Sequence, residues 1–567
     1  MRRAAALLAL ATVALPGLAS GAQGPRAILV LGSPGIPYEE AISDPELRAA
    51  AASGGIGLMT THADPEAAAA RTLLTGGAER DLLDVVRGEG LTAVRVEDLA
   101  GDLREADLVV VGPGPVDLAG VAEAAGQAET LLVLVFPNPS PAMRERGDVV
   151  TPIVVARGPM ILAEGGSVSG LTSDTTRRAG LVANVDVAPT LLAHLGVPAP
   201  GEMTGSPIEL RGDPPGDLHE RFLESRALRL PLQLLALALA LAALVAISLF
   251  LGLRPAAPEL ARALGGWTLI VISLPIALLP VSVLPRITWV TALALAALLT
   301  AAIAGGAWIV GDRDPTAAVA LVGAAGVAAL LLDSVAGWPA MMAPIIGGGA
   351  FDGVRFHGIG NVYAGVLLAG AVLVAAHLRP WTGVALLGLA ALFAGLPGLG
   401  SNLGAAATLA AAAGLWGVLR LRRRLGALEI LIAAGAAIAG TAIVILAHRL
   451  LAPDVSHIAR AASDAGGLGA LVEDGLRRLG SNLELTSRVP VAWLVIVALV
   501  GAAWASARRL GHLARDPEWR DACLVLALSA LVGFVVNDTG IGLAGLAFAY
   551  LAAALAYPAL EASWTRR

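Results

Sequence analysis

The chain has 567 residues, of which 56% are hydrophobic and only 15% are charged, and its mean hydropathy is +0.74. This composition excludes a disordered, fibrous or wholly soluble protein. The single cysteine, Cys523, excludes a disulfide framework and any metal site with several cysteine ligands. All 39 basic residues are arginine, which excludes Schiff-base chemistry and a phosphate-binding lysine.

Residues 1–22 are predicted to form a secretory signal peptide. Two arginines near the start, a short apolar core over residues 4–15 and small residues at 20–22 are typical of such a segment and its cleavage site. The apolar core is short for a membrane span. Whether this segment is cleaved or kept as an anchor, the residues after it are expected to be exported.

Charge divides the rest of the chain into two unlike parts. Residues 25–229 contain 16 arginines and 29 acidic residues, whereas residues 230–567 contain 21 arginines and 16 acidic residues. The acidic balance of the first part argues against nucleic acid as a partner. We predict an exported domain at 25–210, a linker at 211–229 and a membrane domain at 230–567.

The second part contains about eleven apolar stretches of nearly bilayer length, plus or minus one. This pattern predicts an all-α polytopic membrane domain. The stretches lie at 230–253, 264–284, 287–310, 315–337, 360–378, 381–399, 402–419, 426–448, 489–507, 521–537 and 540–559. An exported first domain makes the first helix run from outside to inside. Alternation then places fourteen arginines in inside segments and seven in outside segments, as expected for a cytoplasmic C-terminus.

Residues 25–210 are predicted to form an α/β domain. Apolar runs of strand length occur at 27–31, 107–111, 131–136 and 152–156, with helix-like segments between them. Because these runs are continuous rather than alternating, they favour a parallel sheet that is covered on both faces.

The stretch Asp186-Val-Ala-Pro-Thr-Leu-Leu-Ala-His-Leu-Gly-Val-Pro198 resembles the C-terminal signature of the alkaline phosphatase superfamily, and Gly76 lies in a segment similar to another part of that superfamily. The resemblance implies an alkaline phosphatase-like sheet. It also implies a two-metal site built from Asp and His, with a nucleophile just after the first strand.

The residues here depart from that pattern. Gly32-Ser33-Pro34-Gly35 stands where the superfamily would place a metal-binding Asp, and no Asp-His pair occurs in the exported domain. Without ligands to activate it, Ser33 would be inert. We therefore predict a degenerate, non-catalytic domain with no metal and no cofactor, in which Asp186 caps the helix opened by Pro189.

Polar residues gather on the predicted outer face of the membrane domain. Each of these polar segments, taken alone, is typical of a turn or a helix cap. If the segments converge on one face, they form a polar cavity in which Arg355 lies close to Asp352 or Asp538. The candidate catalytic residues are Asp352, Arg355 and His357, and the candidate substrate-binding residues are Asn361, Asn402, His457, Arg460, Arg478, Asn537 and Asp538.

Three of these segments, at 355–361, 456–460 and 537–540, resemble an uncharacterised family of bacterial polytopic membrane proteins with a phosphatase-like exported domain. The resemblance covers most of the chain and implies that the outer segments belong together, but it implies no activity. Together with the predicted signal peptide, it points to a bacterial cytoplasmic membrane with the N-terminal domain outside. Val362 departs from the family, where an acidic residue is expected after Asn361.

Three functions remain open. The first is a metal-independent transferase or assembly factor of the cell envelope that acts on a lipid-linked glycan or a phospholipid headgroup at the outer leaflet. Arg355 and Arg478 would hold its phosphate, and Asp352 or His357 would activate the acceptor. The second is a transporter or flippase with helices broken at Pro275, Pro280, Pro339 and Pro344. The third is a membrane-anchored scaffold pseudoenzyme, which needs no cavity. The lipid bilayer is an expected partner in all three.

The predicted topology can be tested with single cysteines in a Cys523→Ala background. An impermeant thiol reagent added to intact cells is expected to label Gly467→Cys, in an outer loop, and not Leu425→Cys, in an inner loop. Labelling of both positions would contradict this topology.

Overall fold

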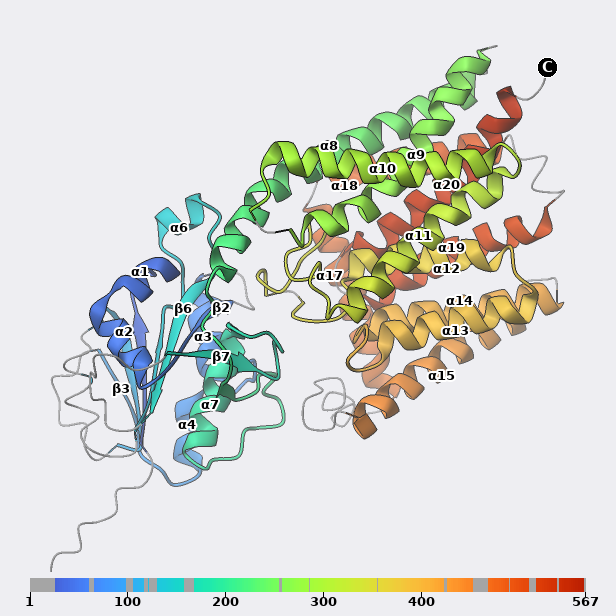
Figure 1. The fold of residues 1–567 in the computed structure, drawn as a ribbon. Coiled ribbons are helices and arrows are strands. Elements are labelled where there is room, and N and C mark those ends of the chain that lie inside the picture. The colour runs from blue at the N-terminus through green and yellow to red at the C-terminus, as the bar shows by residue number, and fades with distance from the viewer. Residues whose placement is uncertain are drawn as a thin grey trace, which may run out of the picture.

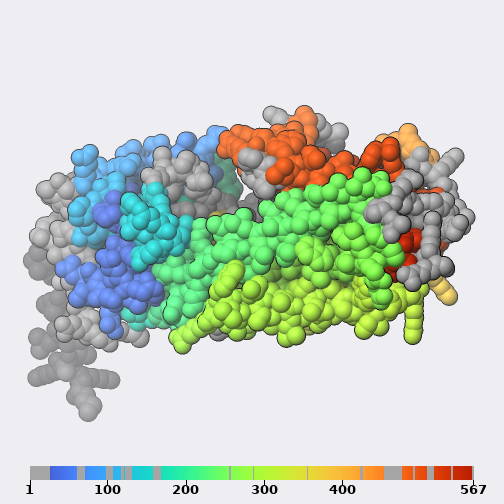
Figure 2. Space-filling view, turned by 90° about the horizontal axis from the view of Figure 1, so that it is seen from above, coloured from blue at the N-terminus to red at the C-terminus, as the bar shows by residue number. Residues whose placement is uncertain are grey.

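The computed structural model describes residues 26–60, 66–97, 106–116, 121, 130–157, 168–253, 257–284, 286–353, 355–422, 426–451, 468–488, 490–508, 516–537 and 540–564. An α/β domain is followed by a helical domain, and helix α8 (Leu218–Leu253) runs from the first into the second (Figure 1). The space-filling view shows the α/β domain, blue to cyan, at one end of the molecule (Figure 2). With 36 residues, α8 is about 54 Å long, well beyond the ~30 Å apolar core of a bilayer.

The α/β domain is built on one mixed sheet with the strand order β3-β4-β1-β5-β6-β2-β7-β9, and β8 also pairs with β2. The strands are β1 (Arg26–Gly32), β2 (Gly54–Thr60), β3 (Ala93–Val96), β4 (Leu108–Gly114), β5 (Thr130–Val135), β6 (Thr151–Arg157), β7 (Ser169–Ser173), β8 (Leu181–Ala183) and β9 (Ile208–Leu210). β6 is antiparallel to both of its neighbours, and β9 is antiparallel to β7. The sheet is therefore mixed. The apolar runs had led us to expect a wholly parallel sheet, and that expectation was wrong.

Both faces of the sheet are covered, which explains the continuous apolar runs. In β1, Leu29 and Leu31 belong to one buried cluster, whereas Ile28 and Val30 belong to another on the opposite face. The first cluster includes residues of α4 (Leu82–Gly88) and α7 (Val187–His194), and the second includes residues of α1 (Tyr38–Ser43) and α2 (Pro45–Ala52). The remaining helices of this domain are α3 (Glu66–Thr75) and α6 (Pro141–Glu145).

The carboxyl ends of β1, β2, β5, β7 and β8 share one edge of the sheet, because these strands all run in the same direction. In open α/β sheets this is the edge at which ligands bind. Here the start of α8 and the turn after β7 lie at this edge, and both contact other parts of the molecule, as described below. The carboxyl edge therefore faces the helical domain.

Each of the eleven predicted apolar stretches contains a helix. The helices after α8 are α9 (Pro258–Val281), α10 (Trp289–Gly311), α11 (Pro315–Val335), α12 (Asn361–Ala375), α13 (Pro380–Gly395), α14 (Leu403–Arg422), α15 (Ala427–Leu451), α17 (Leu468–Ser487), α18 (Pro490–Ala507), α19 (Pro517–Val536) and α20 (Gly542–Trp564). Among the described residues, eight are long and apolar enough to cross a membrane, or nine if the bent pair 476–487 and 492–506 is one span. These helices are compatible with an integral membrane protein, but eleven spans are not confirmed.

Two apolar helices fall short of bilayer length. α12 and α13 have 15 and 16 residues, so each rises only about 22–24 Å. Nearly every side chain of α12 is buried, because α11, α13 and α20 pack around it. The irregular residues 336–360 precede α12, and we call them the α11–α12 connection. Backbone that is neither helix nor strand is tolerated near a bilayer only where protein or water covers it.

His219 fastens the first turn of α8 to the α/β domain. Its side chain is fully buried, with Nδ1 2.6 Å from Glu39 Oε1 and Nε2 3.0 Å from both carboxylate oxygens of Asp148. The ring lies between Tyr38 and Phe222. Because a carboxylate only accepts, both ring nitrogens must donate, and this requires the imidazolium form. A charged triad therefore holds the membrane-directed helix at the edge of the sheet.

Removing this histidine is expected to destabilise the α/β domain strongly. His219→Ala would leave the Asp148 carboxylate, whose side chain is only 2% exposed, without its cation, and the expected loss is about 3–5 kcal/mol of unfolding free energy. Glu39→Ala is the matched control: this side chain is 57% exposed, so its loss is expected to cost about 1 kcal/mol or less. Pulse proteolysis of the full chain over a urea series measures both values, and equal effects of the two substitutions would contradict the proposed role of the buried pair.

Candidate functional site

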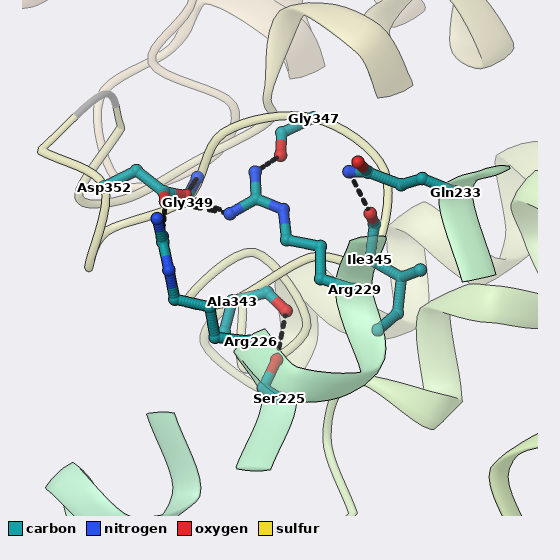
Figure 3. Close-up of polar contacts among 9 residues, drawn as sticks. All are labelled: Ser225, Arg226, Arg229, Gln233, Ala343, Ile345, Gly347, Gly349 and Asp352. Atoms are coloured by element: carbon teal, nitrogen blue, oxygen red, sulfur yellow. Dashed lines mark hydrogen bonds and ion pairs between the residues drawn. The ribbon is translucent and has the colours of Figure 1, made fainter. Parts of the chain in front are cut away.

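The α11–α12 connection carries the three candidate catalytic residues, and one side of α8 holds it in place (Figure 3). Ser225 Oγ donates to the Ala343 carbonyl at 3.1 Å, and Gln233 Nε2 donates to the Ile345 carbonyl at 2.6 Å. Arg229 donates to the carbonyl of Gly347. Residues 225, 229 and 233 are spaced by four, so they line one side of the helix. The sequence analysis had placed 218–229 in a linker, whereas these residues form the first turns of α8.

Asp352 is the centre of this contact. Its carboxylate accepts from Arg226 at 3.1 Å, from Arg229 at 2.7 and 2.8 Å, and from the Gly349 amide at 2.8 Å. Its side chain is only 17% exposed. Two guanidinium groups thus surround one ionised carboxylate, and one positive charge is left over. To act as a general base, Asp352 would have to exchange these partners for a substrate proton, and its catalytic role stays a prediction.

The other two candidate catalytic residues follow Asp352 closely. Arg355 Nη1 donates to the Ser401 carbonyl at 3.3 Å, which connects it to the turn between α13 and α14. His357 is half-buried in the same connection. The cations that the structure pairs with Asp352 are Arg226 and Arg229, and Asp538, the other expected partner of Arg355, lies outside the described residues.

Asparagines from four distant segments meet beside this connection. Asn402 Nδ2 donates to Asn361 Oδ1 at 2.6 Å, which joins the start of α12 to the start of α14. Asn482 of α17 donates to the Asn537 carbonyl at 2.5 Å and to the Phe534 carbonyl at 2.6 Å, and it accepts from the Gly540 amide at 2.7 Å. A Cβ on Gly404 would collide with the Asn537 side chain, so the two pairs are neighbours. The structure therefore brings Asn361, Asn402 and Asn537 together.

The remaining predicted site residues are less informative. Arg478 lies half-buried on α17, while His457, Arg460 and Asp538 lie outside the described residues. Among the described residues, no group of three or more His, Cys, Asp or Glu side chains is arranged so that it could hold a metal ion. Ser33 is exposed just after β1, and its amide donates to the Gly114 carbonyl at 2.9 Å.

Asp186, in the segment that resembles the phosphatase signature, has a structural environment different from the one expected. It accepts from Ser173 Oγ at 2.7 Å, from the Ala183 amide at 2.9 Å and from the Ser206 amide at 3.0 Å. It lies at the N-cap position of α7, but its side chain makes no capping hydrogen bond. The expectation of a side-chain cap was therefore wrong, because this carboxylate instead ties β7, β8 and the loop before β9 together. Burial raises the pKa of the Asp186 carboxyl against the opposing effect of these donors.

The α/β domain reaches the α11–α12 connection at two points. Phe351 belongs to a buried cluster of the α/β domain, and its ring lies 4.7 Å from that of Phe222. Arg178, in the turn after β7, donates to three backbone carbonyls of the helical domain. Sequence reasoning missed Arg178, Arg226 and Arg229, and only the spacing of Arg226 and Arg229 just before an apolar run could have drawn attention to two of them.

A cavity of about 100 Å³ lies where the two domains meet (it has room for about three water molecules). It is enclosed by the start of α8, the turn between α9 and α10, and the α11–α12 connection. Its lining is mainly apolar, with residues such as Leu228, Leu284, Met342 and Phe351, and it includes the polar residues Arg221, Ser225 and Ser282. Arg221 Nε also lies 3.9 Å from Asp217 Oδ2.

Comparison with known proteins adds no identification. No family model, no curated protein and no solved structure matches the chain.

The asparagine cluster yields a stability prediction. Asn482→Leu would leave the Gly540 amide and the Phe534 and Asn537 carbonyls without this partner, with an expected loss of about 1–3 kcal/mol of unfolding free energy. Ser481→Leu adds a similar side chain at the neighbouring exposed position and is expected to change little. Tryptophan fluorescence during denaturation suits the measurement, because all ten tryptophans lie in the helical domain. Equal stability of Asn482→Leu and wild type would show that the cluster does not hold α17 in place.

Proposed function

We propose that this chain is an integral membrane protein of a bacterial cell envelope that binds the phosphorylated headgroup of a lipid or lipid-linked glycan at the outer leaflet. The cavity between the two domains is the observation that carries this proposal. Its apolar lining would contact the first part of an acyl or isoprenoid tail, and the Arg221 guanidinium would pair with the phosphate.

The position of the cavity supports an amphiphilic ligand. α9 ends at Val281 and α10 begins at Trp289, so the cavity lies at the ends of two membrane-length helices. Val283 and Leu284 contribute to its lining and are also exposed at the surface, where they would meet lipid. An exposed tryptophan at the start of α10 is typical of the interface between headgroups and apolar core.

In this proposal the α/β domain is a degenerate alkaline phosphatase-like domain that forms a non-catalytic wall of the site. The carboxylate of Asp186, in the phosphatase-like segment, accepts three hydrogen bonds from donors within the domain. The start of α8 and Phe351 cover part of the carboxyl edge of the sheet. A ligand that used this edge would therefore have to bind where the two domains meet.

In this proposal Asp352 is a positioning residue for the α11–α12 connection. It holds Arg226 and Arg229 of α8 and, with them, the connection that closes one side of the cavity. A transfer reaction on the bound headgroup, with His357 as the base, would extend the proposal, since Asp352 is held by two guanidinium groups.

Lipid retention by the purified full chain tests the proposal. After incubation with phosphatidylglycerol and phosphatidylcholine in equal amounts, native mass spectrometry is expected to show preferential retention of the anionic lipid. Ala343→Trp would fill the cavity and is expected to lower this retention about tenfold. Arg221→Ala is expected to abolish the preference for phosphatidylglycerol without abolishing binding.

Ala336→Trp is the matched control, because it adds the same bulk at an exposed position of the same connection. Retention that is equal for the two lipids in wild type, or unchanged in Ala343→Trp, would contradict the proposal. If Ala343→Trp does not fold, the preference measured in Arg221→Ala decides.

A further inference from the structure

Arg178 reaches out of the α/β domain into a ring of carbonyl oxygens. Its Nη1 donates to the Gly337 carbonyl at 2.8 Å, and its Nη2 donates to the Trp338 carbonyl at 3.0 Å. Its Nε donates to the Phe356 carbonyl at 3.1 Å. All three nitrogens of one guanidinium group thus have acceptors on the helical domain, and these acceptors come from both ends of the α11–α12 connection.

The acceptors are fixed by the backbone at the end of α11. Gly337 and Trp338 have φ values of +83° and +64°, and left-handed backbone is rare for a residue as large as tryptophan. Trp338 keeps this conformation because it is buried and because its Nε1 donates to the Leu399 carbonyl at 3.0 Å. A strained conformation that the surroundings hold in place is a feature of ligand-binding geometry.

A buried carboxylate lies in the same turn of the chain as two of these acceptors. Asp333, at the last turn of α11, is 8% exposed, and its Oδ1 accepts from the Ala340 amide at 2.9 Å. Its Oδ2 is buried without a hydrogen-bond partner among the described residues. Burial lowers the pKa of the Arg178 guanidinium, and the Asp333 charge opposes this effect. Three carbonyl oxygens therefore contact the Arg178 guanidinium, and the Asp333 carboxylate and the negative end of the α11 dipole add negative charge at the same end of this helix.

We propose that the end of α11 is a binding site for a guanidinium group, formed by Asp333 and the carbonyls of Gly337, Trp338 and Phe356, and that Arg178 is its resident ligand. Docking of the α/β domain on the helical domain is then an intramolecular ligand–receptor contact. This inference does not depend on the proposed lipid site, which lies on α8 and the α9–α10 turn.

The geometry selects a guanidinium over other cations. A guanidinium group is planar and presents its N–H donors in fixed directions, so it can serve three carbonyls at once. An ammonium group is a compact point charge on a flexible stem, and it requires different acceptor positions. Arg178→Lys would keep the charge but lose the match to the three carbonyls.

Chemical rescue of the full-length protein in detergent tests the proposal. In Arg178→Ala, amide hydrogen exchange over residues 333–360 is expected to rise about tenfold, because the ring loses its ligand. Guanidinium chloride, far below the concentrations that unfold proteins, is expected to restore protection, whereas ammonium chloride at equal ionic strength is not. Arg178→Lys is expected to recover only part of the wild-type protection.

Two further variants sharpen the result. Arg177→Ala is the matched control, because the side chain of this neighbouring arginine is exposed and donates to the nearby Asp174 carbonyl of its own turn. Exchange is therefore expected to stay at the wild-type level. Asp333→Asn keeps Arg178 but removes the carboxylate charge, and its exchange over 333–360 is expected to rise without rescue by guanidinium.

Rescue by ammonium as strong as by guanidinium, or wild-type protection in Arg178→Lys, would overturn the proposal and leave an ordinary charge contact. If Arg178→Ala does not fold, Arg178→Lys takes its place. Added guanidinium should then restore the protection that lysine fails to give, and failure to do so overturns the proposal equally.

Discussion

The pairing of Asp352 with Arg226 and Arg229 fixes the α11–α12 connection against α8, and most of the junction between the domains depends on it. Because all three side chains are largely shielded from water, these charges are screened less than surface pairs, and loss of one member would leave another charge without its partner. The backbone of the connection has no regular structure of its own, so α8 side chains provide hydrogen bonds that a helix would form internally. With the connection in place, Phe351 can enter the α/β domain and the carbonyls of Gly337 and Phe356 can face Arg178.

Regular elements were the part of this fold that the sequence predicted well. Helices occur at all eleven apolar stretches, and strands β1, β4, β5 and β6 occur at the four predicted apolar runs. These predictions rest on local patterns of hydrophobicity, which depend only on residues that are close in the chain. The antiparallel direction of β6 was missed, because an apolar run on a two-sided sheet looks the same whichever way the strand runs. The shortness of α12 and α13 was also missed, since apolar residues continue beyond the ends of both helices.

The candidate site shows where sequence reasoning stops. Convergence of Asn361, Asn402 and Asn537 was expected from their common position at helix ends, and the structure brings them together. The partners of Asp352 were not expected, because Arg226 lies 126 residues away and had been counted with a linker. Asp186 was expected to cap its own helix, but its side chain instead accepts from the Ser206 amide, 20 residues along the chain. In each case residue type indicated a polar contact, while the choice of partner depended on tertiary packing.

The way the domains join limits where any chemistry could take place. The carboxyl edge of the sheet, at which an open α/β domain ordinarily binds its ligand, faces the helical domain, and His219, Phe351 and Arg178 each cross the junction there. The end of α11 faces the same junction from the other side, where the carbonyls of Gly337 and Trp338 accept from Arg178. A ligand that enters between the domains would meet groups from both, whereas a ligand of either domain alone would have to displace contacts that hold the two together. The arrangement therefore favours one shared site over two independent ones, and it makes the docked state of the α/β domain a condition for whatever the junction binds.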